Sequence, residues 1–127
     1  MSSFLDCYRP VDVQLNDIRQ LLASPGVSMW YAGFETTAIA IKMITQDPSK
    51  LIRVTRRLYY DVADEQGVTP ASIERRIRHT AEMAWDCNPE HLEELTGCYF
   101  PECPTSTQFL GGLAFYYLIK REEKASA

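Results

Sequence analysis

The chain lacks any stretch in which apolar and polar residues alternate for long enough to predict a β-strand. It has no apolar run of the roughly 20 residues that a membrane-spanning helix needs. Its first residues, MSSFLDCYRP, do not have the basic start and apolar block of a signal peptide. These absences predict a cytoplasmic protein with no membrane partner. With 127 residues, 46% of them hydrophobic, the chain is long enough for one domain with a buried core.

Catalytic sequence motifs are also missing. There is no H-E-x-x-H, no P-loop and no G-x-S-x-G, and the two histidines, His79 and His91, are far apart in sequence. We therefore expect no enzyme activity and no cofactor.

The chain contains four cysteines, which are Cys7, Cys87, Cys98 and Cys103. Nothing else in the sequence indicates secretion, so we expect reduced thiols rather than disulfides. A zinc site built from Cys87, His91, Cys98 and Cys103 is the alternative, but only the Cys98–Cys103 spacing fits a typical ligand pair. Our main interpretation places Cys87 at a helix end and the other two in a loop.

Helical periodicity, interrupted by turn residues, is what the sequence does contain. It predicts helices over 13–22, 30–45, 70–85, 88–97 and 106–123, with one or two short helices between residues 50 and 66. The run at 30–45 is apolar around much of its circumference, which is typical of a central, buried helix. A Gly111–Gly112 pair in the last helix indicates close packing or a kink. The predicted fold class is therefore all-α, a compact bundle of about six helices.

Residues 58–85 have the layout of a helix-turn-helix. Gly67 suits the left-handed residue that ends a helix, Thr69 suits an N-cap, and Pro70 suits the first helical position. The residues expected to pack between the two helices are Leu58, Val62, Ala63, Val68, Ile73 and Ile77.

Basic residues gather in this region of an otherwise acidic chain. Residues 50–79 carry seven basic and four acidic residues, a net charge of +3, whereas the whole chain has a net charge of −4. Arg75, Arg78 and His79 share the helix face opposite the apolar stripe, and Arg76 flanks that stripe. A helix fits the major groove of B-DNA, where a guanidinium can pair with O6 and N7 of guanine. The pattern favours binding to double-stranded DNA.

Two alternatives to DNA binding stay open. Glu74–Arg78 and Arg78–Glu82 are i,i+4 pairs of the kind found on any solvated helix. The chain could also be a protein-interaction module that binds or blocks a full-length relative without contacting DNA. The aromatic residues of the last helix, FLGGLAFYYLIK, favour that module, although core packing explains them as well.

The stretch LYYDVADEQGVTPASIERRIRHTAEMAW resembles the C-terminal DNA-binding effector domain of the bacterial sporulation master response regulator family. The similarity continues outward from about residue 26, is weaker from Asn88 onward, and includes PTSTQF and the final helix. It implies a six-helix regulator whose recognition helix, at about 70–85, lies in the major groove. It also implies a homodimer on adjacent promoter sites, with RNA polymerase or a full-length relative as further candidate partners.

Charge and resemblance together predict the residues that contact DNA. Glu74, Arg75, Arg78 and His79 match the recognition-helix motif of the family, and Arg75 is the expected base reader. Thr69 matches a position suited to a phosphate contact. The candidates for further phosphate contacts are Lys50, Arg53, Arg56, Arg57 and Arg76.

Two departures from the family are visible. Ser72 stands where the family usually has a DNA-binding arginine, and Arg76 stands where a small residue is common, so we expect a changed preference for DNA sequence. Family proteins also carry a receiver domain, but only about 25 residues, an N-terminal extension and first helix, precede the similarity here. We therefore expect one effector-like domain over residues 1–127 that its own phosphorylation does not switch. The start at Met1 favours a natural short protein over a fragment.

Overall fold

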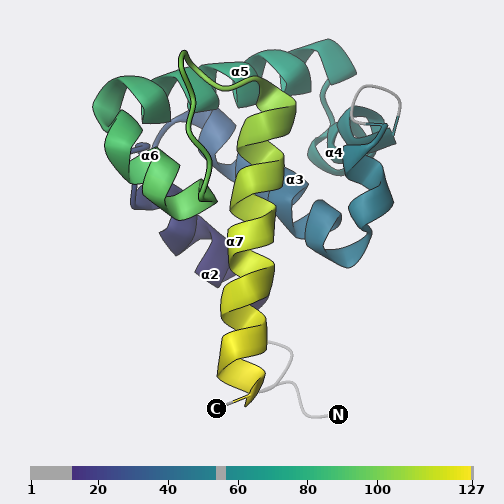
Figure 1. The fold of residues 1–127 in the computed structure, drawn as a ribbon. Coiled ribbons are helices and arrows are strands. Elements are labelled where there is room, and N and C mark those ends of the chain that lie inside the picture. Colours follow the sequence, from purple (N-terminus) through teal and green to yellow (C-terminus); the bar gives the residue numbers. More distant parts are fainter. Residues whose placement is uncertain (1–12, 54–56, 127) are drawn as a thin grey trace.

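The computed structural model describes residues 13–53 and 57–126. Within these ranges the chain forms six α-helices and one 3-10 helix, and no strand. The elements are α2 (Val13–Ala23), α3 (Ala32–Gln46), the 3-10 helix η1 (Pro48–Leu51), α4 (Tyr59–Gln66), α5 (Pro70–Cys87), α6 (Pro89–Thr96) and α7 (Ser106–Ser126). They form a compact bundle (Figure 1), which confirms the predicted all-α fold. None of the described helices is long and apolar enough to cross a membrane.

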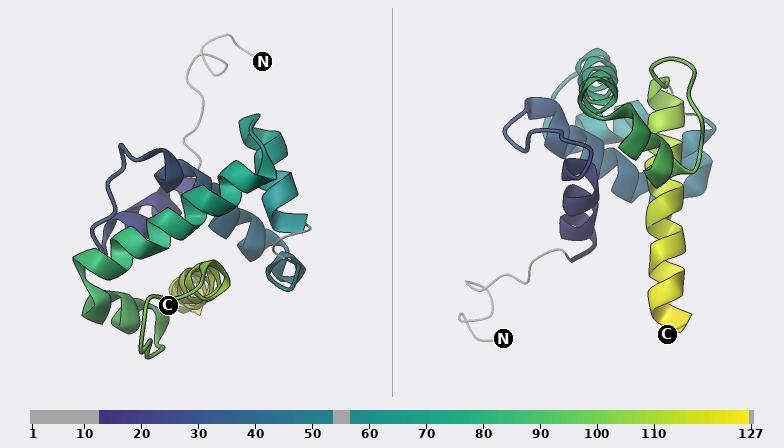
Figure 2. Two further views of the ribbon diagram at one scale, coloured as in Figure 1. Left: turned by 90° about the horizontal axis from the view of Figure 1, so that it is seen from above. Right: turned by 60° about the vertical axis from the view of Figure 1, so that its left-hand side comes forward.

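Helix α3 is central, as its apolar circumference predicts. It packs against α2, α4, α5 and α7, and Phe34, Ala38, Ile41 and Ile44 are all buried. Viewed from above, α5 runs across the bundle and α7 is seen end-on beside it (Figure 2). The core therefore lies beneath α5, and α5 forms one outer face of the molecule.

The central helix is predicted to start at about Trp30, and α3 begins two residues later, at Ala32. The backbone N–H of Trp30 donates to Ser28 Oγ at 3.2 Å, and that of Tyr31 donates to the Ser28 carbonyl at 3.1 Å. These bonds hold residues 28–31 in a turn, so Trp30 lies outside the helix.

The other turn residues act where the sequence predicts. Gly67 and Gly97 both have a φ of 69° and follow the ends of α4 and α6. Thr69 Oγ1 accepts a hydrogen bond from the backbone N–H of Ser72 at 3.2 Å, which caps α5. The helical pattern at 50–66 is interrupted, because η1 ends at Leu51 and α4 begins at Tyr59.

The Gly111–Gly112 pair allows close helix packing. A Cβ atom on Gly112 would lie 2.6 Å from Cγ2 and 2.8 Å from Cβ of Thr96 in α6. A Cβ atom on Gly111 would lie 3.0 Å from Cδ2 of Leu51. The pair thus brings α7 against both α6 and η1.

Gly112→Ala is expected to lower the free energy of unfolding by about 1–3 kcal/mol, because Cβ of Thr96 cannot move without its backbone. Gly111→Ala is the matched control. The tip of the Leu51 side chain can rotate away, and alanine favours a helix over glycine by about 1 kcal/mol. Urea denaturation of both variants measures the difference, and equal stabilities would show that α6 and α7 are not packed this tightly.

Candidate nucleic-acid interface

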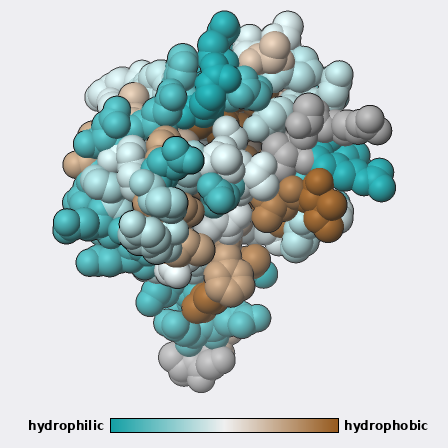
Figure 3. Space-filling model, turned by 45° about the horizontal axis from the view of Figure 1, so that its top comes forward, coloured by the Kyte–Doolittle hydropathy of each residue, from teal (hydrophilic) through white to brown (hydrophobic). Residues whose placement is uncertain are grey.

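Helix α5 turns its apolar side to the core and its basic side to solvent. The buried residues on its apolar side are Ile73, Ile77, Ala81 and Ala84. Arg75, Arg78 and His79 are exposed, and in Figure 2 no described helix crosses over α5 on its outer side. Hydrophilic side chains cover much of the face seen in Figure 3, and hydrophobic residues form separate patches on it. The predicted basic face is therefore accessible.

The three exposed residues differ in what holds them. Within the described residues, Arg75 and His79 make no hydrogen bond or ion pair. Arg78 Nη1 donates to both carboxylate oxygens of Glu74, at 2.8 and 3.0 Å. An exposed pair of this kind contributes about 0–1 kcal/mol, so a phosphate or a base edge can compete for Arg78.

Arg76 lies on the flank of α5 that faces α3. It is half-buried, and its Nη1 donates to Oγ1 of Thr36 at 3.4 Å. Thr36 Oγ1 in turn donates to the side-chain oxygen of Gln66 at the end of α4. Arg76 therefore connects α5 to α3 and α4, and as a residue it is only half-buried.

The predicted phosphate contacts outside α5 are placed differently from one another. Lys50 is half-buried and forms an ion pair with Asp61 of α4, whereas Arg53 and Arg57 are exposed. Arg53 and Arg57 lie on either side of residues 54–56 in the chain, between the end of η1 and the start of α4. Arg56 lies outside the described residues.

The C-terminal half of α5 is acidic. Glu82 is predicted on the exposed face as a partner of Arg78, but the predicted DNA-binding surface is not limited by it. Glu82 and Asp86 are exposed there and face the loop between α6 and α7. Burial raises the pKa of the Cys103 thiol in that loop, and Glu82, Asp86 and Glu102 raise the pKa further, so the thiol stays protonated at neutral pH. The signal was present in the sequence as acidic residues after His79. Only the N-terminal half of α5 therefore suits a polyanion.

Cys87, Cys98 and Cys103 do not form a metal site among the described residues. Cys87 is the last residue of α5, and Cys98 and Cys103 lie in the loop after α6, as predicted. All three are free thiols. The described residues contain no group of three or more His, Cys, Asp or Glu side chains that could hold a metal ion, so the alternative zinc site with His91 does not form.

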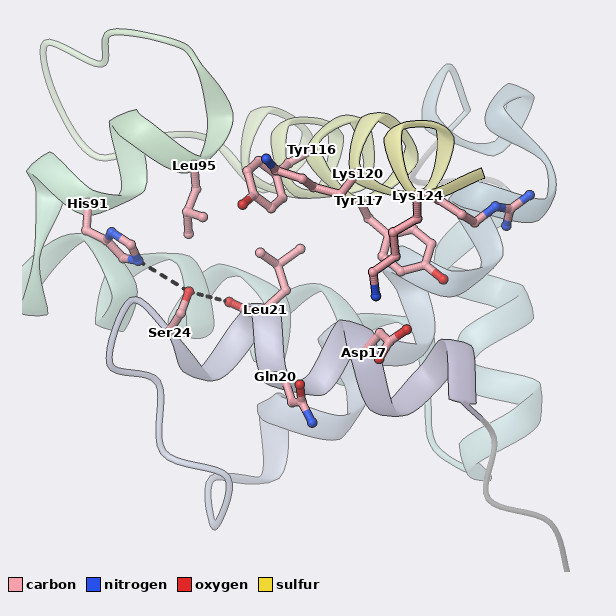
Figure 4. A pocket seen from close by; sticks show the side chains of 11 residues that line it. Asp17, Gln20, Leu21, Ser24, His91, Leu95, Tyr116, Tyr117, Lys120 and Lys124 are labelled. Atoms are coloured by element: carbon pink, nitrogen blue, oxygen red, sulfur yellow. Dashed lines mark hydrogen bonds between the residues drawn. The ribbon is translucent and has the colours of Figure 1, made fainter. Parts of the chain in front are cut away.

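A cavity of about 520 Å³ opens between α2, α6 and α7 (Figure 4). Leu21, Leu95 and Tyr116 line it, and Nε2 of His91 lies 3.3 Å from Oγ of Ser24 at one end. No residue of α4 or α5 lines this cavity. It is therefore separate from the basic face of α5.

A helical bundle with one open, basic helix face is typical of the DNA-binding domains of transcription regulators. Residues 18–115 match the protein family described as "Sporulation initiation factor Spo0A C terminal". The match covers most of the chain, so the chain belongs to this family of DNA-binding effector domains. The family is one of transcription factors and not of enzymes.

Proposed function

We propose that the chain is a sequence-specific transcriptional regulator that inserts the N-terminal half of α5 into the major groove of double-stranded DNA. In this proposal α4, the turn at Gly67 and α5 act as a helix-turn-helix, and α4 braces α5. The observation that carries it is the exposed Arg75, which no hydrogen bond or ion pair holds within the described residues. A guanidinium in that state can form the bidentate pair with guanine without first breaking a contact in the fold.

The remaining residues take supporting roles. Arg78, Glu74 and His79 contact or frame the neighbouring bases. Thr69, Ser72 and the backbone N–H groups at the start of α5 face a phosphate. Candidates for further phosphate contacts are Lys50, Arg53, Arg56, Arg57 and the exposed part of Arg76. Two copies bind adjacent sites as a homodimer.

A second candidate function, a protein-interaction module, is favoured by α7. Phe115 is 61% exposed, so core packing does not explain it, whereas Tyr117 is buried. Ile119, four residues after Phe115, is also exposed. Gel filtration with and without a duplex separates the two functions, because the module would bind a relative and leave the duplex free.

Selection of bound sequences from random duplexes tests the main proposal. We expect one short motif to be enriched, and the affinity for it to fall steeply as salt rises, with a slope of about −0.9 per phosphate contacted. A scrambled duplex of equal composition is the control. If no motif is enriched and the chain ignores both duplexes at low salt, it does not read DNA.

A further inference from the structure

Two large apolar side chains are exposed next to each other in the turn before α3. Trp30 is 91% exposed and Met29 is 63% exposed. Together they form the Met29–Trp30 shoulder. Tryptophan and methionine are enriched in binding interfaces, so two adjacent exposed examples call for a partner.

The shoulder is fixed to α5 at two points. Gly26 adopts a φ of 102°, and a Cβ atom there would lie 3.0 Å from Cβ of Cys87 at the end of α5. Gly33, in the first turn of α3, approaches α5 more closely still, because a Cβ atom added there would lie 2.7 Å from the carbonyl oxygen of Arg76. Residues 26–33 are thus held along one side of α5.

Tyr31 shows which part of α5 the shoulder accompanies. Burial raises the pKa of its phenol most, the positive charge of Arg76 lowers that pKa, the carboxylate of Glu82 raises it, and Arg75 lowers it by the smallest amount. Tyr31 therefore lies within reach of the field of both arginines, and Trp30 precedes it directly in the chain. The shoulder lies beside the middle of α5, where the basic N-terminal half meets the acidic C-terminal half.

We propose that the Met29–Trp30 shoulder packs against the sugar–phosphate backbone at one edge of the major groove that receives α5. This inference rests on the proposed function and adds a second contacting element to it. The groove is about 12 Å wide, close to the diameter of a helix with its side chains. Whatever flanks α5 must therefore meet the backbone of the duplex. The indole ring covers a deoxyribose, and its N–H donates to a phosphate oxygen.

The opposite flank of α5 offers a natural contrast. Seen with α5 nearly end-on, the loop before α3 lies on one side of it and the loop after α6 on the other (Figure 2). That second loop exposes Tyr99, which is 80% exposed and shares a surface hollow with Glu90, Glu93 and Glu94. A phosphate is repelled by those three carboxylates, whereas on the shoulder's side two cations, Arg75 and Arg76, outnumber the single carboxylate of Glu82. Charge therefore selects the Met29–Trp30 shoulder and not the Tyr99 loop as the flank that meets DNA.

Affinity measurements with a duplex long enough for one copy test the proposal. Trp30→Ala should weaken binding about tenfold, as truncation of a desolvated aromatic anchor does. The dependence of affinity on salt should stay unchanged, because tryptophan releases no counterion. Tyr99→Ala, the matched exposed aromatic on the acidic flank, should bind like the wild type. Circular dichroism checks that both variants are folded.

Fluorescence reports the contact itself. The chain has two tryptophans, and Trp85 is half-buried against Phe100 with its ring centroid 6.5 Å away. Trp85→Phe leaves Trp30 as the single indole. Its quenching by acrylamide should fall by at least half on the duplex, because an interface excludes quencher as it excludes solvent.

The outcomes separate this inference from the proposed function. If the wild type binds no duplex in an anisotropy assay, the proposed function fails and the shoulder contact fails with it. If the wild type binds but Trp30→Ala binds equally and Trp30 stays open to acrylamide, only the shoulder contact is overturned. Loss of self-association in Trp30→Ala, with unchanged DNA affinity, also overturns it, because the shoulder then serves a protein partner.

Discussion

Arg75→Ala is expected to weaken binding to the preferred duplex by about 1–3 kcal/mol, or roughly 5- to 150-fold, and to relax base preference at one position. The expected loss is large because, within the described residues, Arg75 makes no hydrogen bond or ion pair, so the substitution removes the proposed base contact without breaking a contact in the fold. Fluorescence anisotropy at fixed salt, with the selected duplex and single-base variants of it, measures both effects.

Two further variants divide the effect into charge and geometry. Arg75→Lys keeps the charge but loses the planar fork, so base preference should be lost while the salt dependence is retained. Lys120→Ala is the charge control. Lys120 is exposed on α7, where its Nζ lies 3.4 Å from Oε1 of Glu123. Removing this positive charge should leave DNA binding unchanged. If Arg75→Ala binds its best duplex as tightly as the wild type, the role assigned to Arg75 is wrong.

The end of α4 and the start of α5 could be predicted because their causes are local. Gly67, Thr69 and Pro70 each act within one turn of their own position, and each is found where its chemistry places it. The same holds for the exposure of Arg75, which follows from the angle between it and the buried Ile73 and Ile77. Local chemistry was therefore sufficient to predict where the recognition-helix candidate starts and which of its sides faces solvent.

Features that depend on distant contacts could not be read in this way. Arg76 turns toward Thr36, which is forty residues away in sequence and meets it only because α3 crosses α5. Phe115 and Tyr117 lie about 200° apart on a helix, so one of them must leave the core, and hydrophobicity alone does not say which. The structure buries Tyr117 and exposes Phe115.

Trp30 was missed for a different reason. The apolar pattern of α3 extends through Trp30. The backbone N–H groups of residues 30 and 31 bond to Ser28 instead of entering the helix, so Trp30 stays in the turn. A serine two residues before the first apolar residue of a run is a weak signal. The exposure of Trp30 becomes clear only from the structure, in which Gly26 and Gly33 hold the loop against α5.

Gly33→Ala is expected to have the largest effect on stability, a loss of about 3 kcal/mol. A Cβ atom at this position would lie 2.7 Å from the carbonyl oxygen of Arg76 and 2.6 Å from Oγ1 of Thr80. Neither atom can yield cheaply, because the Thr80 hydroxyl is buried and donates to that same carbonyl at 2.7 Å. The central helix would have to move away from α5. Urea denaturation followed by circular dichroism measures the loss.

Gly67→Ala separates this steric effect from the general cost of replacing glycine. Gly67 has a φ of 69°, and a Cβ atom added there would have nothing within 4 Å, so alanine adds backbone strain of about 1–2 kcal/mol and no collision. Gly33 carries the opposite combination, a crowded site in ordinary helical backbone. If Gly33→Ala is no less stable than Gly67→Ala, the two helices do not meet as closely as described. The placement of Arg76 and of the Met29–Trp30 shoulder beside α5 would then lose its support, because both depend on that crossing.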